Sequence, residues 1–277
     1  MFELDYLVIG HVTRDLVDGA FVVGGTVSYA ARTARALGCR AGIITSASPD
    51  LDLGGVLDGV AIARFPAAAT TTFENIYTSD GRRQMLHSVA ETLMPAMVPP
   101  HWRATIAHLG PVAQECDPAL ANVFGDAFVG LTPQGWMRRW DQAGHVNPCR
   151  WERAGELLAR ADAVVLSEED VAGDKALVAQ YAAQTRLLVV TQAVAGCTVY
   201  VAGQARHFPA SAVREVDPTG VGDIFAAAFF VWLQRGGDPW TAARFANCVA
   251  ARSVTQAGLS GTPGPQEVSR CERALGG

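Results

Sequence analysis

The stretch Glu215–Leu233, E-V-D-P-T-G-V-G-D-I-F-A-A-A-F-F-V-W-L, decides the fold of this chain. Gly220 and Gly222 stand two residues apart, directly before ten apolar residues that include no helix breaker. Apolar side chains recur on both sides of the helix that this run predicts, so we expect a tight glycine turn followed by a buried helix. The amino end of that helix is then held deep inside the molecule.

This helix start is a candidate anion site. The first backbone N–H groups of a helix lack partners within it and carry a partial positive charge. Gly220, Val221 and Gly222 would supply those amides, and Asp223 follows in the first turn, where the helix dipole favours the ionised carboxylate. A base beside an anion hole suggests phosphoryl transfer. The alternative is that Asp223 only caps the helix and the glycines only form the turn.

The motif D-P-T-G-V-G-D resembles the carboxyl-terminal signature of the ribokinase-like (PfkB) carbohydrate kinases, usually written D-T-x-G-A-G-D. Pro218 replaces the first Thr, and Val221 replaces the usual Ala. The resemblance implies that Asp223 is the catalytic base, that Gly220 to Gly222 form the anion hole, and that Thr219 helps bind the nucleotide. It also implies an α/β three-layer sandwich with a mostly parallel central sheet and a small β lid.

Composition limits the class of protein. The chain has 277 residues, of which 49% are hydrophobic and 18% are charged, enough for a sizeable core. A formal net charge of −5 gives no electrostatic case for a nucleic-acid or anionic-membrane partner. The longest apolar run, Ile224 to Leu233, is too short to cross a bilayer, and the first residues lack the features of a secretion signal. We therefore expect a cytoplasmic protein that binds small molecules.

The lysine, cysteine and glycine patterns narrow the chemistry further. A Walker A loop and a protein kinase each need a lysine at a fixed place, and the only lysine, Lys175, fits neither. The PfkB glycine turn needs none. A dinucleotide site is disfavoured because only Gly10 of a G-x-G-x-x-G motif follows the first predicted strand. The six cysteines include no C-x-x-C pair, and we expect them to be reduced.

The amino-terminal part of the chain is predicted to bind the acceptor. A buried strand over Leu4–Gly10 leads into a loop with the sequence G-H-V-T-R-D, which resembles the family's G-x-x-x-x-D. The resemblance implies that Asp15 binds sugar hydroxyls, and a carboxylate can accept hydrogen bonds from two vicinal hydroxyls. The alternative is that Asp15 only caps the loop.

A glycine pair follows in V-G-G-T-V-S-Y-A-A, which resembles the family motif G-G-x-x-x-N-x-A and is closest to the myo-inositol kinase-like branch. The resemblance implies that Gly24 and Gly25 let the substrate approach the backbone. Tyr29 stands where Asn is usual, so the neighbouring Ser28 becomes the candidate for that contact. The alternative is an ordinary helix start with a glycine cap.

Residues 70–90 alternate around a D-G turn at Asp80 and Gly81, which predicts a β-hairpin. A two-stranded ribbon is only marginally stable by itself, so it must pack against something. The resemblance implies a β lid over the sugar near residues 68–92, and a possible homodimer through that lid.

Two elements in the middle of the chain are candidates for contacts with phosphate and metal. P-Q-G-W-M-R-R-W resembles a Q-G-x-x-R element, which implies that Arg138 contacts substrate or phosphate; the alternative is a surface arginine that covers Trp136 and Trp140. S-E-E-D stands where the family has N-x-x-E. Asp170, Glu169 or both would then hold Mg²⁺, which prefers oxygen ligands.

The resemblance also implies a nucleotide site in the last third of the chain. Thr191 and Gly196 fit a T-x-G-x-x-G element in which Ala193 replaces the first glycine. Asn247 and Gly258 match positions that line the adenine pocket, although Asn247 also fits a buried, hydrogen-bonded helix residue.

We therefore expect one domain over residues 1–277, an ATP- and Mg²⁺-dependent kinase that acts on a hydroxyl of a sugar or cyclitol, with myo-inositol favoured. A nucleoside kinase on the same scaffold, a non-catalytic sugar-binding regulator and a dinucleotide oxidoreductase remain as alternatives. The intact G-V-G-D argues against the regulator, because an inactive binder needs no base at a phosphate hole.

Overall fold

A central sheet of nine strands organises the molecule, in the order β15-β14-β13-β12-β9-β8-β1-β4-β5. The strands from β5 to β13 pair in parallel, and β14 and β15 form an antiparallel edge. The computed structural model describes residues 1–17, 19–78 and 81–275. The strands of this sheet are β1 (Phe2–Ile9), β4 (Ala41–Ala47), β5 (Ala61–Pro66), β8 (Trp102–Leu109), β9 (Phe128–Leu131), β12 (Ala163–Ser167), β13 (Leu187–Thr191), β14 (Cys197–Val201) and β15 (Gln204–Phe208).

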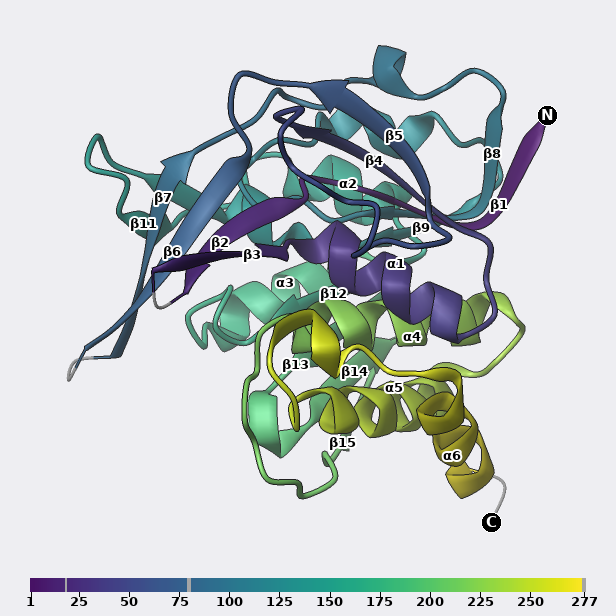
Figure 1. The fold of residues 1–277 in the computed structure, drawn as a ribbon. Coiled ribbons are helices and arrows are strands. Elements are labelled where there is room, and N and C mark those ends of the chain that lie inside the picture. Colours follow the sequence, from purple (N-terminus) through teal and green to yellow (C-terminus); the bar gives the residue numbers. More distant parts are fainter. Residues whose placement is uncertain (18, 79–80, 276–277) are drawn as a thin grey trace.

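Helices cover both faces of the sheet (Figure 1). On β1, Tyr6 and Val8 belong to the core beneath α1, α4 and α5, whereas Leu7 and Ile9 belong to the core beneath α2 and α3. Because successive side chains of a strand point to opposite faces, such a strand is buried on both sides. The predicted three-layer α/β sandwich is confirmed. The helices are α1 (Thr26–Ala36), α2 (Ala154–Arg160), α3 (Lys175–Gln184), α4 (Val221–Gln234), α5 (Pro239–Ser253) and α6 (Pro265–Leu275), with 3₁₀ helices η1 (Pro95–Met97), η2 (Pro118–Asn122), η3 (Pro133–Met137), η4 (Ala193–Ala195) and η5 (Gly258–Gly261).

The helix that the opening stretch predicts is α4. Its residues from Ile224 to Val231 are all buried, and it packs against α1 and α5. The glycine turn precedes it as expected, with Gly220 in the left-handed conformation. The expectation of a buried helix with its amino end inside the molecule is confirmed. Within the described ranges, no helix combines the length and the apolar character needed to cross a membrane.

A second sheet of four strands, in the order β3-β2-β6-β7, stands where the lid is predicted and projects from one side of the sandwich (Figure 1). The predicted hairpin is present as β6 (Thr71–Thr78) and β7 (Gly81–Ser88), although Asp80 of its turn lies outside the described residues. Asp15 is not in a loop, as expected from the sequence, but in β2 (Thr13–Val17), which pairs with β3 (Ala20–Gly24) and with β6. A smaller ribbon of β10 (Arg138–Trp140) and β11 (Val146–Pro148) lies beside β7. We call the four strands the lid sheet.

The root of the lid sheet is tied to the end of β1 through His11. This side chain is fully buried, its Nε2 donates to the carbonyl of Glu91 at 2.8 Å, and the Thr71 hydroxyl lies 2.7 Å from its Nδ1. The Ala90 amide donates to the same Thr71 hydroxyl at 3.0 Å. Both chain segments that connect the lid hairpin to the sandwich are therefore hydrogen-bonded at one point.

One sequence-based expectation about the cysteines is wrong. Cys248 in α5 and Cys271 in α6 form a disulfide, whereas Cys39, Cys116, Cys149 and Cys197 are free as expected. The two partners are separated by 23 residues in sequence and meet because α5 and α6 pack together. Such a pair leaves no C-x-x-C signal.

Candidate functional site

Two helices begin side by side at the carboxyl edge of the sheet. α1 follows Gly25 and α4 follows Gly220, and both glycines have positive φ angles, +86° and +76°. A side chain on Gly25 would collide with the His11 carbonyl, and one on Gly220 would collide with the ring of Tyr29. Both turns therefore require glycine, and they bring two positively polarised helix ends together.

Asp223 lies between these two helix ends. It is half-buried in the first turn of α4, and Thr26 in the first turn of α1 hydrogen-bonds its carboxylate. Burial raises the pKa of Asp223 to about 6, although the Thr26 hydrogen bond and the charge of Arg138 oppose this rise. With this pKa the carboxylate is about 90% ionised at pH 7, as expected, and its role as a base stays a prediction. Burial is the largest of the effects on this pKa.

Arg138 and Asp170 face the same region. Each lies within electrostatic range of Asp223, and the charge of Arg138 lowers the pKa of both carboxyl groups. Asp170 accepts hydrogen bonds from the Ser167 amide at 2.8 Å and from Gln134 Nε2 at 3.4 Å, while burial, the dominant effect, raises its pKa. The three side chains come from different elements, yet together they form one charged cluster.

The carboxylate oxygens at and beside Asp170 suit a magnesium ion that binds together with phosphates. Asp170 is half-buried beside Asp223, and Glu169 is exposed next to it. Over the described ranges, no three His, Cys, Asp or Glu residues gather as a complete metal site. Mg²⁺ usually keeps several waters and binds through one or two carboxylates together with substrate phosphates. The residues present therefore fit Mg²⁺, and Asp170 and Glu169 are the residues that would hold it.

The predicted acceptor residues meet where β2 and β3 pair. The carboxylate of Asp15 lies directly over Gly24, so that any side chain at this glycine would collide with it. Thr13, two residues before Asp15 on the same strand face, lies against the same glycine. Ser28 is completely buried and donates to the Gly24 carbonyl at 2.7 Å, so its direct contact with a substrate stays a prediction.

Thr13 is a candidate ligand that the sequence reasoning missed. It is 2% exposed, and within the described part of the chain its Oγ1 atom has no hydrogen-bond partner. A buried hydroxyl without a partner is costly, which makes it a group that a ligand would satisfy. The alternation of T-R-D within β2, which places Thr13 and Asp15 on one face, is the signal that was available.

The buried carboxylate of Glu115 connects two loops on the side of the site where the acceptor is predicted to bind. Glu115 is 1% exposed and accepts hydrogen bonds from the amides of His11 at 2.9 Å, Val112 at 3.0 Å and Ala113 at 2.7 Å. These amides belong to the loops that follow β1 and β8. Glu115 therefore joins two neighbouring strand ends, a role that no sequence motif indicated.

On the donor side, Asp217 links two of the predicted cofactor-binding residues. Its carboxylate accepts from the amide of Thr219 at 2.9 Å and from the amide of Gly258 at 2.7 Å. The turn that leads into α4 and the loop at Gly258 are thereby fixed to each other. Thr219, Gly220 and Gly258 thus form one wall of the candidate site.

The remaining predicted cofactor residues gather at the ends of β13 to β15. A side chain on Gly196 would collide with the Phe208 carbonyl, and Asn247 Nδ2 donates to that same carbonyl at 3.0 Å. Thr191 donates to the Leu166 carbonyl at 3.3 Å. Asn247 thus has the hydrogen-bonded position of the alternative interpretation, and its contact with adenine stays a prediction.

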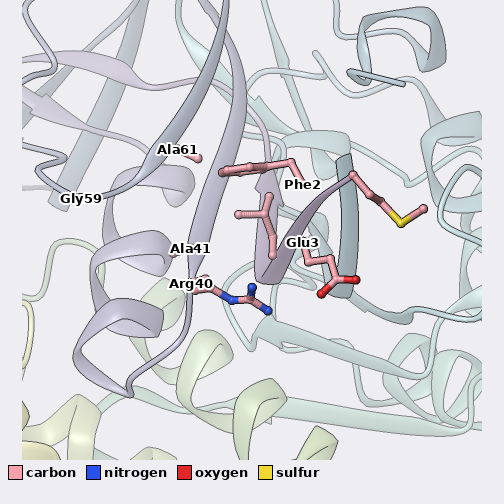
Figure 2. A pocket seen from close by; sticks show the side chains of 8 residues that line it. Phe2, Glu3, Arg40, Ala41, Gly59 and Ala61 are labelled. Carbon is pink, nitrogen blue, oxygen red and sulfur yellow. The ribbon is translucent and has the colours of Figure 1, made fainter. Parts of the chain in front are cut away.

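A separate pocket of about 400 Å³ lies away from this site (Figure 2). Phe2, Ala41 and Ala61, at the amino ends of β1, β4 and β5, line it together with Arg40. Asp223, Asp15 and the two glycine turns lie at or beyond the carboxyl ends of parallel strands, where the sites of α/β proteins form. The pocket in Figure 2 is therefore on the opposite edge of the sheet.

The two glycines of the anion turn should respond differently to alanine. Gly220→Ala combines a left-handed backbone with a collision against the buried Tyr29 ring, and we expect it to destabilise the fold by about 2–4 kcal/mol. At Gly222, a methyl group meets nothing within 4 Å, so Gly222→Ala should be neutral or stabilising by about 0.5–1 kcal/mol. Urea unfolding of both variants checks this, and equal losses would contradict it.

Comparisons with known proteins show to which family the chain belongs. Residues 88–265 match the family described as pfkB family carbohydrate kinase. A fructokinase from Klebsiella pneumoniae is 29% identical over 201 residues, which is 64% of this chain and 64% of the fructokinase, so the match spans less than two thirds of that relative. A cytidine kinase from Thermococcus kodakarensis is 28% identical over 264 residues, 84% of this chain and 90% of that kinase.

Solved structures share the fold at lower identity. A pyrophosphate-dependent kinase in the ribokinase family, complexed with a pyrophosphate analog and myo-inositol, has a TM-score of 0.82 and 22% identity, covering 96% of this chain and 99% of its own. An Arabidopsis thaliana ribokinase complexed with ribose and ATP has a TM-score of 0.72 and 18% identity, covering 98% and 99%. The structural matches show a ribokinase-like fold, and the match to the family over residues 88–265 places this chain in the pfkB family of carbohydrate kinases.

Proposed function

We propose that residues 1–277 form one kinase domain that transfers the γ-phosphoryl group of ATP to a hydroxyl of a sugar or cyclitol, with myo-inositol favoured. The observation that carries this proposal is Asp223, a carboxylate with a pKa of about 6 in the first turn of α4, beside the Gly220 turn. A base with that pKa is ionised at neutral pH and still basic enough to take a hydroxyl proton. The backbone amides next to it suit the phosphate.

In the proposed reaction the acceptor hydroxyl oxygen attacks the γ-phosphorus of ATP. A new O–P bond forms, the bond from the γ-phosphorus to the β–γ bridging oxygen breaks, and ADP leaves with the bonding electrons. The hydroxyl proton passes to the carboxylate of Asp223. The amides of Gly220 to Gly222 and the guanidinium of Arg138 stabilise negative charge on the phosphates, because preorganised donors act strongly in a water-poor site.

Asp170, with the exposed Glu169 beside it, would hold Mg²⁺. When bound, the ion would neutralise phosphate charge and orient the donor. Asp170 keeps its own orientation through hydrogen bonds from the Ser167 amide and from Gln134.

Asp15 and Thr13 would recognise the acceptor. The carboxylate of Asp15 can accept hydrogen bonds from two vicinal hydroxyls, and the unpartnered hydroxyl of Thr13 can bond to a third group nearby. Gly24 and Gly25 leave the backbone open at this point. A polyol such as myo-inositol matches this set, and the myo-inositol complex of the pyrophosphate-dependent relative supports the same choice.

Pyrophosphate is the second candidate donor, with a specific observation behind it. The pyrophosphate-dependent relative has a higher TM-score, 0.82, than the ATP-bound ribokinase, 0.72. In this chain the Asn247 amide is already engaged by the Phe208 carbonyl, which leaves it less free to contact a base. The turn at Gly220 would accept the phosphates of either donor.

Two alternatives for the acceptor and the role remain open. A nucleoside kinase is favoured by the similarity to a cytidine kinase over 84% of this chain, and a non-catalytic sugar binder would need no base.

A homodimer through the lid sheet is also proposed, supported by the exposure of Phe21 and Val22 on β3.

A matched panel tests the proposal. Wild-type protein and Asp223→Ala are incubated with Mg²⁺ and either ATP or pyrophosphate, and phosphorylated product is measured for myo-inositol, ribose, fructose, fructose 6-phosphate, adenosine, cytidine and inosine. We expect one acceptor to give product with the wild type and none with the variant. Saturable sugar binding by calorimetry without product from any pair would favour the non-catalytic binder instead.

The pH dependence of kcat/KM should follow the protonation of Asp223. Since Asp223 must be deprotonated to accept a proton, kcat/KM should be constant above its pKa of about 6 and fall about tenfold per pH unit below it. Donor phosphates also titrate near pH 6. The residual activity of Asp223→Asn therefore serves as the control, since it keeps only the titration of the donor. A wild-type profile that is flat down to pH 4.5 would contradict the role of Asp223.

A further inference from the structure

Tyr29 occupies the centre of the candidate site. It belongs to the first turn of α1, and its ring lies on Gly220 so closely that a side chain there would collide with it. Its hydroxyl points toward Gly258, 3.9 Å from where a Cβ atom on that glycine would be. Tyr29 therefore lies along the wall that Asp217 holds together by bonding the amides of Thr219 and Gly258.

The side chain of Tyr29 is buried as a whole, yet its hydroxyl has no role in holding the described part of the fold together. The residue is 3% exposed, and none of the hydrogen bonds among the described residues involves its hydroxyl. Tyr6, another buried tyrosine, is bonded to His108 Nδ1 at 2.8 Å. A phenol deep in a protein usually finds a partner, so an unpartnered one beside a predicted phosphate site suggests a bond to a ligand.

Its surroundings keep this hydroxyl protonated. Burial and the charges of Asp15, Asp223 and Asp217 raise the pKa of Tyr29 well above its usual range, and the charge of Arg32 opposes this only weakly. These carboxylates are themselves occupied: Asp223 by Thr26 and Asp217 by two amides. Tyr29 is thus a neutral O–H donor that is not bonded to any of them.

We propose that the Tyr29 hydroxyl donates a hydrogen bond to a phosphate oxygen of the phosphoryl donor held at the Gly220–Gly222 turn. This inference rests on the proposed function. The donor side is indicated because the hydroxyl points to Gly258 and the ring covers Gly220, both on the wall fixed by Asp217. The shared chemistry is a pyrophosphoryl group, which ATP and inorganic pyrophosphate both carry. Tyr29 keeps its proton throughout the reaction, so it binds and orients the donor.

Tyr29→Phe isolates the hydroxyl because it keeps the ring that packs on Gly220. Tyr181→Phe is the matched control, since it removes a phenol that is buried in α3, in the core on the opposite face of the sheet. We would measure the Kd of magnesium pyrophosphate and of a non-hydrolysable ATP analogue by calorimetry for wild type and both variants. In the same proteins, kcat and the KM of the acceptor would be measured, and thermal unfolding would report on the fold.

We expect Tyr29→Phe to weaken binding of at least one phosphoryl donor about tenfold or more, because hydrogen bonds to charged groups are worth that much. Its melting temperature and the acceptor KM should stay close to wild type, and Tyr181→Phe should bind the donor normally. Donor affinity that is equal in Tyr29→Phe and wild type, or a loss confined to the acceptor KM, would overturn the inference. If the wild type itself bound neither donor, the proposed function would fail first, which is a separate result.

Discussion

Asp223→Asn lowers kcat by about 10²–10⁴-fold if the carboxylate is the general base, while binding of donor and acceptor remains near wild type. Asn keeps the size of the side chain and can still accept the Thr26 hydrogen bond, so the site stays assembled. Steady-state kinetics with the acceptor identified by the panel, together with calorimetry of the donor, separates the two effects. A kcat within threefold of wild type would contradict the assignment.

The same substitution should stabilise the protein. The pKa of Asp223 is about 6 in the folded state against 3.8 as its ordinary value, so the folded protein binds this proton more tightly than the unfolded chain does. The ionised carboxylate therefore destabilises the fold at pH 7, and Asn removes a cost of about 2 kcal/mol after allowance for partial exposure. The gain should disappear below about pH 4, where the carboxyl is protonated in both states.

Asp126→Asn, at an exposed carboxylate, is the control for this stability difference. It should change the free energy of unfolding by no more than about 0.5 kcal/mol at any pH. Loss of both activity and stability in Asp223→Asn would mean that the site had collapsed.

Glu115→Ala should be the most destabilising substitution near the acceptor side, at about 3–5 kcal/mol. It removes a buried carboxylate that accepts from the amides of His11, Val112 and Ala113, and leaves them without partners. The free energy of unfolding of native proteins is about 5–15 kcal/mol, so a loss of this size can leave the variant close to unfolding. Urea unfolding at low temperature is therefore the suitable measurement.

Two further variants serve as comparisons for the stability lost in Glu115→Ala. Glu115→Gln keeps one acceptor oxygen and should lie between Ala and wild type, whereas Glu152→Ala, at an exposed glutamate, should change stability by less than about 1 kcal/mol. A Glu115→Ala variant as stable as Glu152→Ala would mean that water replaces the carboxylate and that the two loops do not depend on it.

The central helix and the layered fold could be predicted because their signals are local. The apolar run after Gly222 has no breaker and no polar face, which is consistent only with a helix buried on all sides. Glycines at 24, 25, 220 and 222 mark the two helix starts, and the structure places these starts next to each other. Periodicity and glycine spacing therefore predicted the buried helix and the place of Asp223 in its first turn, and the resemblance to the PfkB family implied the layered fold.

The features that were missed depend on contacts between distant parts of the chain. Asp15 was expected in a loop because T-R-D-L-V becomes a strand only through pairing with β3 and β6. Glu115 binds amides from two loops, and Cys248 meets Cys271 across two helices. A short stretch of sequence gives no indication of such contacts between distant residues. The buried hydroxyl of Thr13, which has no partner among the described residues, and the position of the Tyr29 ring over Gly220 become visible only when the surrounding groups are in place.

The bonding of His11 has a mechanical consequence for the lid sheet. Its bonds to Thr71 and Glu91 fix both strands of the hairpin at their base, so the lid cannot swing there as a rigid flap on a free joint. Bending along the described parts of β6 and β7 is the movement that these bonds leave open to the hairpin. Asp15 lies in β2, close to these bonds, and its place over Gly24 is set by the pairing of β2 with β3. If Asp15 binds the acceptor as proposed, its contact with the acceptor would not depend on bending of the lid sheet.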